Sequence, residues 1–323
     1  MTIVVAGAGG FIGGYLVRHL VDKGLQVKAI DVKPLNDWYQ VASNAENVVC
    51  DLREKENCYK VVEGAKVIYN LAADMGGMGF IENNKAACML SSLINTHLLM
   101  AAKDFGVNRY FFSSSACVYA AQKQTTPNVT ALVEADAYPA QPEDGYGWEK
   151  LFGERMCRHF SEDFGIQVSI ARFHNVYGPF GTFDGGREKA PAAICRKVAE
   201  AKLTNKSKIE IWGDGEQTRS FTYIDDCIKG IDKLMSTKYQ DPINLGSSQL
   251  VTINNLVKIV EEIAGVCLEK EYDLSAPQGV RGRNSDNTLI KQVLNWEPST
   301  TLFEGMKQTY MWIENQVVKK LNA

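Results

Sequence analysis

Two residues with catalytic potential stand four positions apart in the segment Tyr146-Gly147-Trp148-Glu149-Lys150. On a helix this spacing places the phenol of Tyr146 and the ammonium of Lys150 on one face. The positive charge of Lys150 favours the phenolate, which makes Tyr146 a usable base near neutral pH. A pair of this kind is usually only a surface contact, so its interpretation depends on the elements around it. Here it follows a glycine-rich loop and a serine-rich segment at residues 112–119.

The glycine-rich loop joins a strand-like segment to a helix-like one. The apolar residues 3–6 run directly into Gly7-Ala8-Gly9-Gly10-Phe11-Ile12-Gly13. Between a strand and a helix, such a loop lets backbone N–H groups and the positive helix end bind a pyrophosphate. We therefore predict a dinucleotide-binding site whose first contacts are Gly7, Gly10, Phe11, Ile12 and Gly13.

Asp31 indicates which dinucleotide binds. It closes the second predicted strand, where its carboxylate can accept hydrogen bonds from ribose hydroxyls and would repel a 2′-phosphate. This favours NAD over NADP, although Lys33 stands close by and weakens the preference. Asp51 and Leu52 follow the third strand and are expected near the adenine, and Ala72 follows the fourth, where the backbone can approach the phosphates and ribose.

Short apolar runs alternate with amphipathic segments through the first half of the chain. This pattern is typical of a parallel sheet covered by helices on both faces, so it predicts an α/β fold of the doubly wound Rossmann type. After Arg172 the pattern becomes irregular and richer in glycine and proline. We predict an NAD-binding domain over residues 1–172, with part of residues 210–245 interleaved, and a smaller C-terminal α/β substrate domain over residues 173–323. The predicted strands are residues 3–6, 26–31, 48–50, 66–70, 109–113 and 167–172, and the main predicted helices are residues 11–23, 83–105 and 146–164.

Composition argues against several functions. The net charge of −3 and the lack of a basic patch give no reason to expect nucleic-acid binding. Residues 2–6 have the character of a buried strand rather than a signal peptide, and no apolar run reaches the ~18 residues of a membrane span, so we expect a cytosolic protein.

The eight cysteines lack metal-ligand spacing. Seven are expected to be reduced core thiols, with Cys117 as the exception.

These motifs resemble those of the extended short-chain dehydrogenase/reductase family, over nearly the whole chain. The resemblance implies that Ser115 and Tyr146 share the proton of a substrate hydroxyl while Lys150 orients NAD. The segment Arg172-Phe173-His174-Asn175-Val176-Tyr177-Gly178-Pro179 matches the strand that leads into the family's substrate domain, with Asn175 near the sugar phosphates. Arg219 and Arg281 match arginines that bind a nucleotide diphosphate.

Three segments resemble the GDP-mannose 3,5-epimerases within this family. They are Ala72-Ala73-Asp74-Met75-Gly76-Gly77-Met78-Gly79-Phe80, Ser114-Ser115-Ala116-Cys117-Val118-Tyr119 and Gly185-Gly186-Arg187-Glu188-Lys189-Ala190-Pro191, of which the first is the most specific. The resemblance implies further substrate contacts from Gly79, Glu188, Lys189 and Lys197. The chain departs from that group's pattern at Ala120, Ala121, Trp148 and Phe183, positions expected at the pocket rim, which leaves the choice of sugar open.

Cys117 reduces the number of reactions that we expect among those of the family. A dehydratase of the family would carry a threonine and an Asp-Glu pair here, and a 4-epimerase usually carries threonine at this position. A thiol in an electropositive site can exchange protons with a carbon that a neighbouring ketone acidifies. The resemblance therefore implies an NAD-dependent isomerase that oxidises C4 transiently and inverts C3 and C5, with Cys117 and Lys189 on opposite faces of the sugar.

The implied conversion is GDP-D-mannose to GDP-L-galactose and GDP-L-gulose, in a homodimer formed through helices 83–105 and 146–164. A UDP-sugar 4-epimerase is the alternative within the family. A non-catalytic NAD-sensing protein is the alternative of a different class, although Ser115, Tyr146 and Lys150 argue against it.

Overall fold

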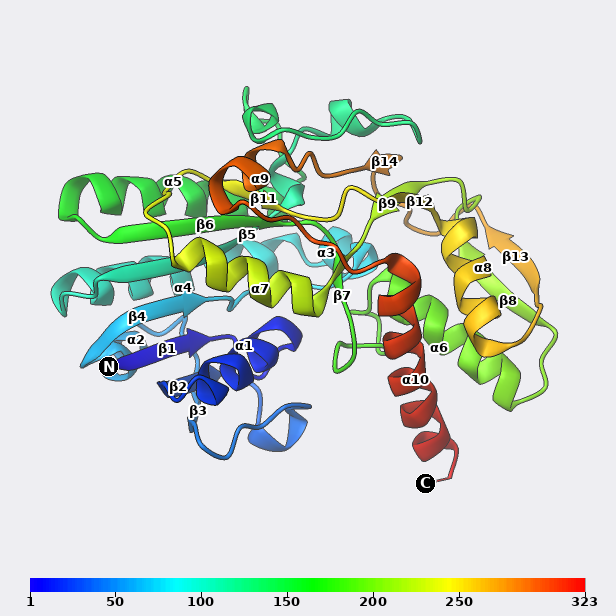
Figure 1. Ribbon diagram of the computed structural model, residues 1–323, viewed down its shortest axis with the longest axis horizontal. Coiled ribbons are helices and arrows are strands. Elements are labelled where there is room, and N and C mark those ends of the chain that lie inside the picture. The colour runs from blue at the N-terminus through cyan, green and yellow to red at the C-terminus, as the bar shows by residue number, and fades with distance from the viewer. Residues whose placement is uncertain (323) are drawn as a thin grey trace.

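A computed structural model describes residues 1–322 and contains a central parallel sheet of seven strands in the order β11-β6-β5-β4-β1-β2-β3 (Figure 1). Strand order reverses between β1 and β4, so the crevice beyond their carboxyl ends is the expected ligand site. The predicted doubly wound α/β fold is confirmed. The seven strands are β1 (Thr2–Ala6), β2 (Gln26–Asp31), β3 (Glu46–Val49), β4 (Ala65–Asn70), β5 (Arg109–Ser115), β6 (Gln167–Phe173) and β11 (Ile243–Leu245).

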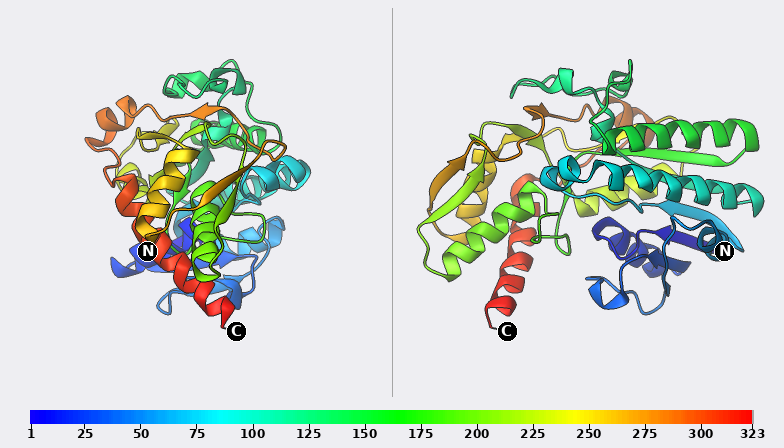
Figure 2. Two further views of the ribbon diagram at one scale, coloured as in Figure 1. Left: turned by 90° about the vertical axis from the view of Figure 1, so that its right-hand side faces the viewer. Right: turned by 180° about the vertical axis from the view of Figure 1, so that it is seen from behind.

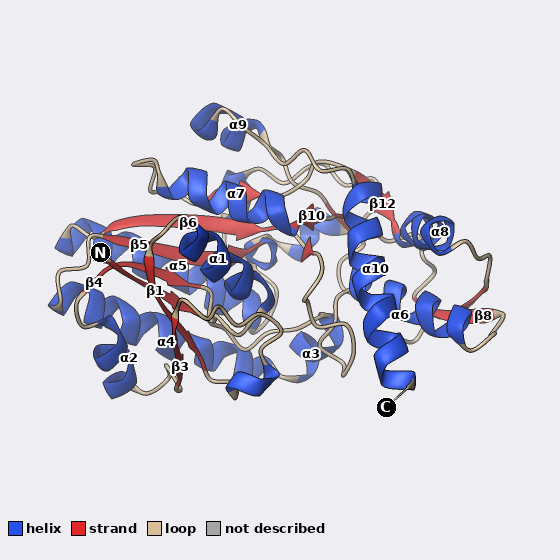
Figure 3. Cartoon of the chain, turned by 60° about the horizontal axis from the view of Figure 1, so that its bottom comes forward, coloured by secondary structure: helices blue, strands red, loops and turns tan. Residues whose placement is uncertain are grey.

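Helices cover both faces of this sheet (Figure 3). On one face lie α2 (Lys55–Val62), α4 (Lys85–Asp104) and α5 (Tyr146–Phe164), and on the other lie α1 (Phe11–Asp22) and α7 (Ile224–Met235). The side chains of β5 alternate between these layers, because successive strand residues point to opposite faces. Phe111 packs with the layer of α1 and α7, whereas Tyr110 and Phe112 pack with the layer of α4 and α5. Each such buried aromatic ring contributes about 1.5–3 kcal/mol.

The predicted helix over residues 83–105 corresponds to α4, which begins two residues later, at Lys85. Asn83 instead ends a separate short helix, α3 (Met78–Asn83), which was not predicted. Asn84 separates them because its backbone leaves the helical region, with φ −132° and ψ 42°. The glycine-rich segment that follows β4 therefore ends in a short helix of its own.

A buried ion pair fixes α5 against the sheet. The guanidinium of Arg172 on β6 donates from Nε and Nη2 to the two carboxylate oxygens of Glu154, at 2.8 and 2.7 Å. Nη1 of Arg172 also donates to the backbone oxygen of Glu134 at 2.7 Å. Because both charged side chains are buried, loss of either partner would cost about 3–5 kcal/mol. This pair holds the helix that begins with Tyr146.

The C-terminal part of the chain forms a second layered unit beside the sheet (Figures 1 and 2). Its helices α6 (Ala190–Leu203), α8 (Ile253–Ala264) and α10 (Leu302–Leu321) pack together, and α9 (Thr288–Leu294) lies near β11. The short strands pair as β7 with β10, β9 with β12 and β14, and β8 with β13. Their bounds are β7 (Val176–Tyr177), β8 (Lys208–Trp212), β9 (Thr218–Ser220), β10 (Thr222–Tyr223), β12 (Leu250–Thr252), β13 (Glu269–Asp273) and β14 (Gly282–Arg283).

The prediction of seven core cysteines is wrong for two of them. Cys267 is exposed and Cys50 is half-buried, and all eight cysteines are free. Cys267 lies between α8 and β13, where the neighbouring Leu268 takes the buried position. Across residues 1–322, no group of side chains has the arrangement of a metal site. Within the same range, no helix combines the length and apolar character needed to cross a bilayer.

Candidate active site

A cavity of about 590 Å³ opens at the carboxyl ends of the central strands. The glycine loop, Asp31 and Asp51 line one part of it, and Ser115, Tyr146 and Lys189 line another. The cavity thus joins the predicted dinucleotide site to the predicted proton-transfer residues.

The glycine loop allows α1 to start almost in contact with β1. A Cβ at Gly13 would stand 2.0 Å from the backbone oxygen of Gly7, which only glycine avoids. The helix N-cap is Gly10, which offers no side chain to the first N–H groups of α1. Those donors remain free for an anion, and the helix dipole adds positive charge there. Gly7, Gly10, Phe11, Ile12 and Gly13 all line the cavity.

The carboxylate of Asp31 is oriented by the backbone around it. Oδ2 accepts from the N–H of Gly9 and Oδ1 from the N–H of Lys33, each at 3.0 Å. Each oxygen retains a lone pair that can accept from a ribose hydroxyl. The Lys33 ammonium donates to the backbone oxygen of Gly9 at 3.3 Å.

The other predicted cofactor contacts also line the cavity, but Asp51 has a partner of its own. Arg53 binds its carboxylate from Nε at 3.1 Å and from Nη2 at 2.6 Å, and this hydrogen bonding holds the pKa of Asp51 below its usual range. Leu52 is buried beside it. The backbone N–H of Ala72 donates to Asn70 at 3.2 Å. The free N–H groups, the oriented Asp31 and the apolar Leu52 together fit a dinucleotide such as NAD.

Tyr146 meets Ser115 where α5 begins. The helix start lies against the segment after β5, because a Cβ at Gly147 would stand 2.4 Å from the backbone oxygen of Cys117. Burial raises the pKa of Tyr146 well above its usual range, and hydrogen bonding with Ser115 acts in the opposite direction. As the first residue of α5, Tyr146 also lies at the positive end of the helix dipole, which favours a phenolate.

Lys150 lies buried beneath Tyr146 and outside the cavity lining. Its Nζ stands 5.5 Å from the centroid of the Tyr146 ring and 4.9 Å from that of Phe112. The same nitrogen is 3.2 Å from Oε2 of Glu149, and burial raises the pKa of this glutamate. The positive charge of Lys150 is thus shared between Tyr146 and a buried carboxylate.

Cys117 is buried next to a pair of charged residues that sequence analysis did not single out. Nη1 of Arg283 donates to the Cys117 sulfur at 3.6 Å, and Nη2 of the same guanidinium pairs with Glu143. Burial, followed by the charge of Glu143, raises the pKa of Cys117 to about 11, while Arg283 acts against this. Arg283 belongs to the Arg281-Gly282-Arg283 motif, but nothing in the sequence indicates which of its arginines turns inward.

Lys189 is held at the cavity by contacts between two loops. The backbone N–H of Gly77 donates to the backbone oxygen of Arg187 at 3.0 Å, and Nη1 of Arg187 pairs with Asp74 at 2.7 Å. The guanidinium also stacks 3.8 Å from the ring centroid of Phe80. Burial lowers the pKa of Lys189, and the charge of Cys117 raises it. Lys189 therefore stands at the cavity together with Ser115 and Tyr146.

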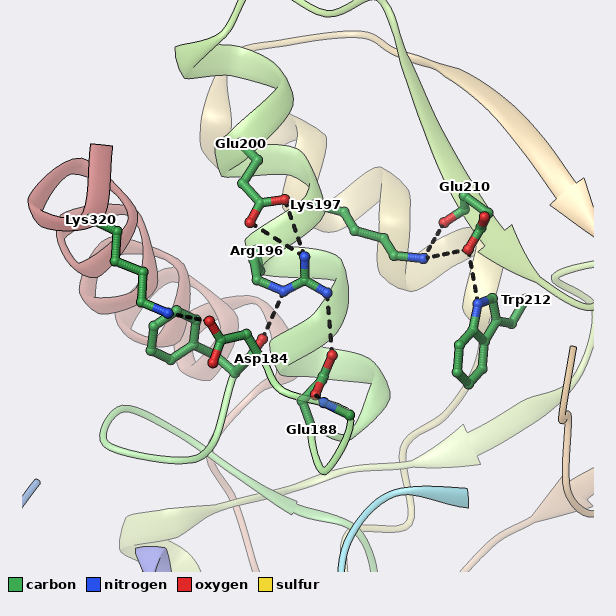
Figure 4. A network of polar contacts seen from close by, with 10 residues as sticks. Asp184, Glu188, Arg196, Lys197, Glu200, Glu210, Trp212 and Lys320 are labelled. Carbon is green, nitrogen blue, oxygen red and sulfur yellow. Dashed lines mark hydrogen bonds and ion pairs between the residues drawn. The ribbon is translucent and has the colours of Figure 1, made fainter. Parts of the chain in front are cut away.

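Cys117 and the remaining predicted substrate residues are not among the residues that line the cavity. Lys197 and Glu188 turn toward partners around α6, as Figure 4 shows: Lys197 donates to the backbone oxygen of Glu210 at 2.8 Å, and Glu188 pairs with Arg196 at 3.2 Å. Gly79 stands beside Trp212, with 3.7 Å between the position of a Cβ and the ring.

Asn175 and the two predicted arginines also have partners. Asn175 donates to the backbone oxygen of Ser220 at 3.1 Å. Arg281 binds both oxygens of Asp214, at 2.8 and 2.7 Å. Arg219 donates to backbone oxygens, including that of Val280 at 2.6 Å, and burial lowers its pKa to about 10.

The parallel sheet, the glycine loop and the Ser115–Tyr146 pair define a dinucleotide-binding protein equipped for proton transfer beside the cofactor. The NAD dependent epimerase/dehydratase family matches residues 3–246, and the chain belongs to this family. The resemblance stated from the motifs is thereby confirmed.

Individual relatives are similar over nearly the whole chain. The GDP-mannose 3,5-epimerase 1 of Oryza sativa subsp. japonica and the GDP-mannose 3,5-epimerase of Arabidopsis thaliana are each 45% identical, over 99% of this chain and 83% and 84% of their own. Among solved structures, the UDP-glucuronic acid 4-epimerase of Bacillus cereus, in complex with UDP-glucuronic acid and NAD, is 26% identical with a TM-score of 0.83. That match covers 98% of this chain and 100% of the other.

Proposed function

We propose that this protein is an NAD-dependent isomerase that converts GDP-D-mannose to GDP-L-galactose and GDP-L-gulose. The carrying observation is that Cys117 packs against Tyr146 and donates from its backbone N–H to Ser115, while Lys189 lines the same cavity as Ser115 and Tyr146. The 45% identity to two GDP-mannose 3,5-epimerases, spread over the whole chain, supports the same reaction.

The first role belongs to Tyr146. With Ser115 it holds the C4 hydroxyl of the sugar and takes the hydroxyl proton, helped by the charge of Lys150 and by the helix dipole. NAD bound in the cavity would accept the C4 hydride and later return it. The ketone at C4 then acidifies the C–H bonds at C3 and C5, which lie within reach of further acids and bases.

Cys117 and Lys189 perform the inversion. One of them removes a proton from carbon, and the other delivers a proton to the opposite face, which inverts the stereocentre. Arg219 and Arg281 neutralise the diphosphate, and Gly79, Asn175, Glu188 and Lys197 complete the substrate contacts once their present partners give way. Gly7, Gly10, Phe11, Ile12, Gly13, Asp31, Asp51, Leu52 and Ala72 hold the cofactor.

We further propose a homodimer. Five exposed apolar side chains on the packed helices α4 and α5 support this arrangement, since exposed apolar side chains favour burial against a second copy. They are Met89, Leu90, Leu93, Trp148 and Phe152. Sedimentation of the wild type and of Phe152→Asp tests this, and a wild type that stays monomeric contradicts it. The free cysteines support a reducing compartment, which we propose is the cytoplasm.

Incubation with a panel of nucleotide sugars in D2O tests the reaction. The 3,5-epimerase reaction places deuterium at C5 and, in the doubly inverted product, at C3. A UDP-sugar 4-epimerase, the alternative favoured by the similarity to the Bacillus cereus enzyme, would invert C4 without deuterium on carbon. Product separation and NMR distinguish the two.

A further inference from the structure

The charges around the Cys117 thiol come from several elements. Its titratable neighbours are Cys88, Glu143, Tyr146, Lys189, Arg219 and Arg283. Three of these can carry positive charge, and Glu143 is a carboxylate. The Ser115 hydroxyl accepts from the Cys117 backbone N–H at 3.2 Å. The proton state of the thiol therefore depends on the balance between these cations and one carboxylate.

Glu143 lies where it can shift that balance. Its backbone N–H donates to the backbone oxygen of Cys117 at 2.9 Å, and its side chain pairs with Arg283. The two charged side chains are only 11% and 5% exposed, and Oε2 of Glu143 is buried without a hydrogen-bond partner among the described residues. The Arg283 guanidinium has a third partner besides Cys117 and Glu143, since its Nε donates to Gln124 at 2.6 Å.

We infer that Glu143 is a positioning residue that neutralises Arg283 and so holds Cys117 as a neutral thiol, which makes Cys117 the proton donor and Lys189 the base. This inference rests on the proposed function. Burial raises the pKa of the thiol and lowers that of the amine, so both groups favour their neutral forms. The contact between Arg283 and the sulfur then stabilises the thiolate that forms when the proton leaves.

The proton transfers balance in this direction. The Lys189 amine takes the proton from C5 and becomes an ammonium, while the electron pair of the C–H bond enters the enolate. The Cys117 thiol gives its proton to C5 from the other face and becomes a thiolate beside Arg283. Exchange with water returns both groups to their neutral states before the next inversion.

The first test measures the thiol directly. Glu143→Gln keeps a hydrogen-bonding side chain of the same size but removes the charge, so Arg283 should favour the thiolate. Loss of a charge this close to a thiol shifts its pKa by about 1–3 units, and here the pKa of Cys117 should fall. Alkylation of Cys117 at pH 8 should therefore become about tenfold faster or more. Mass spectrometry of the Cys117 peptide across pH gives the apparent pKa in the NAD-loaded protein. Glu143→Asp should restore slow alkylation, and an unchanged pKa in Glu143→Gln overturns the inference.

The second test assigns the base without altering Glu143. In D2O, Cys117→Ala should still wash deuterium into C5 of recovered GDP-mannose, because Lys189 can remove and return a proton on one face. Lys189→Met should lose this exchange by at least a hundredfold. The reverse pattern overturns the inference while leaving the epimerase reaction intact. A wild type that places no deuterium on carbon overturns the proposed function instead.

Discussion

Replacement of Asp31 by alanine should weaken NAD binding and abolish the preference over NADP. The carboxylate is placed for the ribose hydroxyls by the N–H groups of Gly9 and Lys33, each at 3.0 Å. A hydrogen bond to a charged group contributes about 1.5–3 kcal/mol, so two ribose hydroxyls account for about 3–6 kcal/mol. At about 1.4 kcal/mol per tenfold change, NAD affinity should fall by about 10²- to 10⁴-fold.

NADP should respond differently to the same change. NADP carries a phosphate in place of the 2′-hydroxyl, so it has no hydrogen bond from that position to lose. The substitution also removes the repulsion between this phosphate and Asp31, so the affinity for NADP should stay the same or rise. Calorimetric titration of the cofactor-free protein measures both affinities. Asp37→Ala is the matched control, because the Asp37 carboxylate lies outside the cavity lining and its loss should leave both affinities within a few-fold. A wild type that prefers NADP, or an Asp31→Ala protein that keeps the NAD preference, would refute the role of Asp31.

Three further predictions follow from other parts of the structure. Tyr146→Phe should lower kcat by about 10²- to 10⁴-fold with NAD and GDP-sugar affinities within a few-fold, and near-normal turnover would contradict its role as base. Gly13→Ala should destabilise the fold by about 1–3 kcal/mol in urea unfolding, because its Cβ would stand 2.0 Å from the Gly7 oxygen; an unchanged midpoint would contradict this. Burial lowers the pKa of His174 to about 3, so only the unfolded chain binds its proton between pH 6.5 and 5. The free energy of unfolding should therefore fall as the pH is lowered through that range, with a slope that approaches about 1.4 kcal/mol per pH unit near pH 5, and His174→Gln should reduce the slope.

Local pattern predicted six of the seven strands of the sheet, most of which are largely buried, but it missed β11, which is only three residues long. β2 and α5 begin and end where the apolar runs predicted. β5 continues to Ser115 beyond the predicted end at residue 113, since its polar serines still pair with β6. Hydrophobicity marks where a strand enters the core, but hydrogen bonding to a neighbour decides where it ends.

The site was predictable where its chemistry lies in one short segment. The glycine loop and the Tyr146–Lys150 spacing carry their meaning in adjacent residues. Arg283 and Glu143 are 140 positions apart, and each occurs in a segment whose composition gives no sign of burial. Their pairing beside Cys117 depends on the packing of β14 against the segment before α5, which no local pattern encodes.

The charge of Arg219 links substrate binding to the proton state of the Cys117 thiol in the inferred reaction. Its described hydrogen bonds end on the backbone oxygens of Thr218, Gln278 and Val280, so within residues 1–322 no carboxylate hydrogen-bonds to its charge. Glu143 acts on this cation only through space, so the cation favours the Cys117 thiolate in the free protein. A diphosphate bound at Arg219 would remove that influence, because its negative charge compensates the guanidinium. If the inferred roles hold, substrate binding and Glu143 act in the same direction, and together they would present Cys117 to the sugar as an acid.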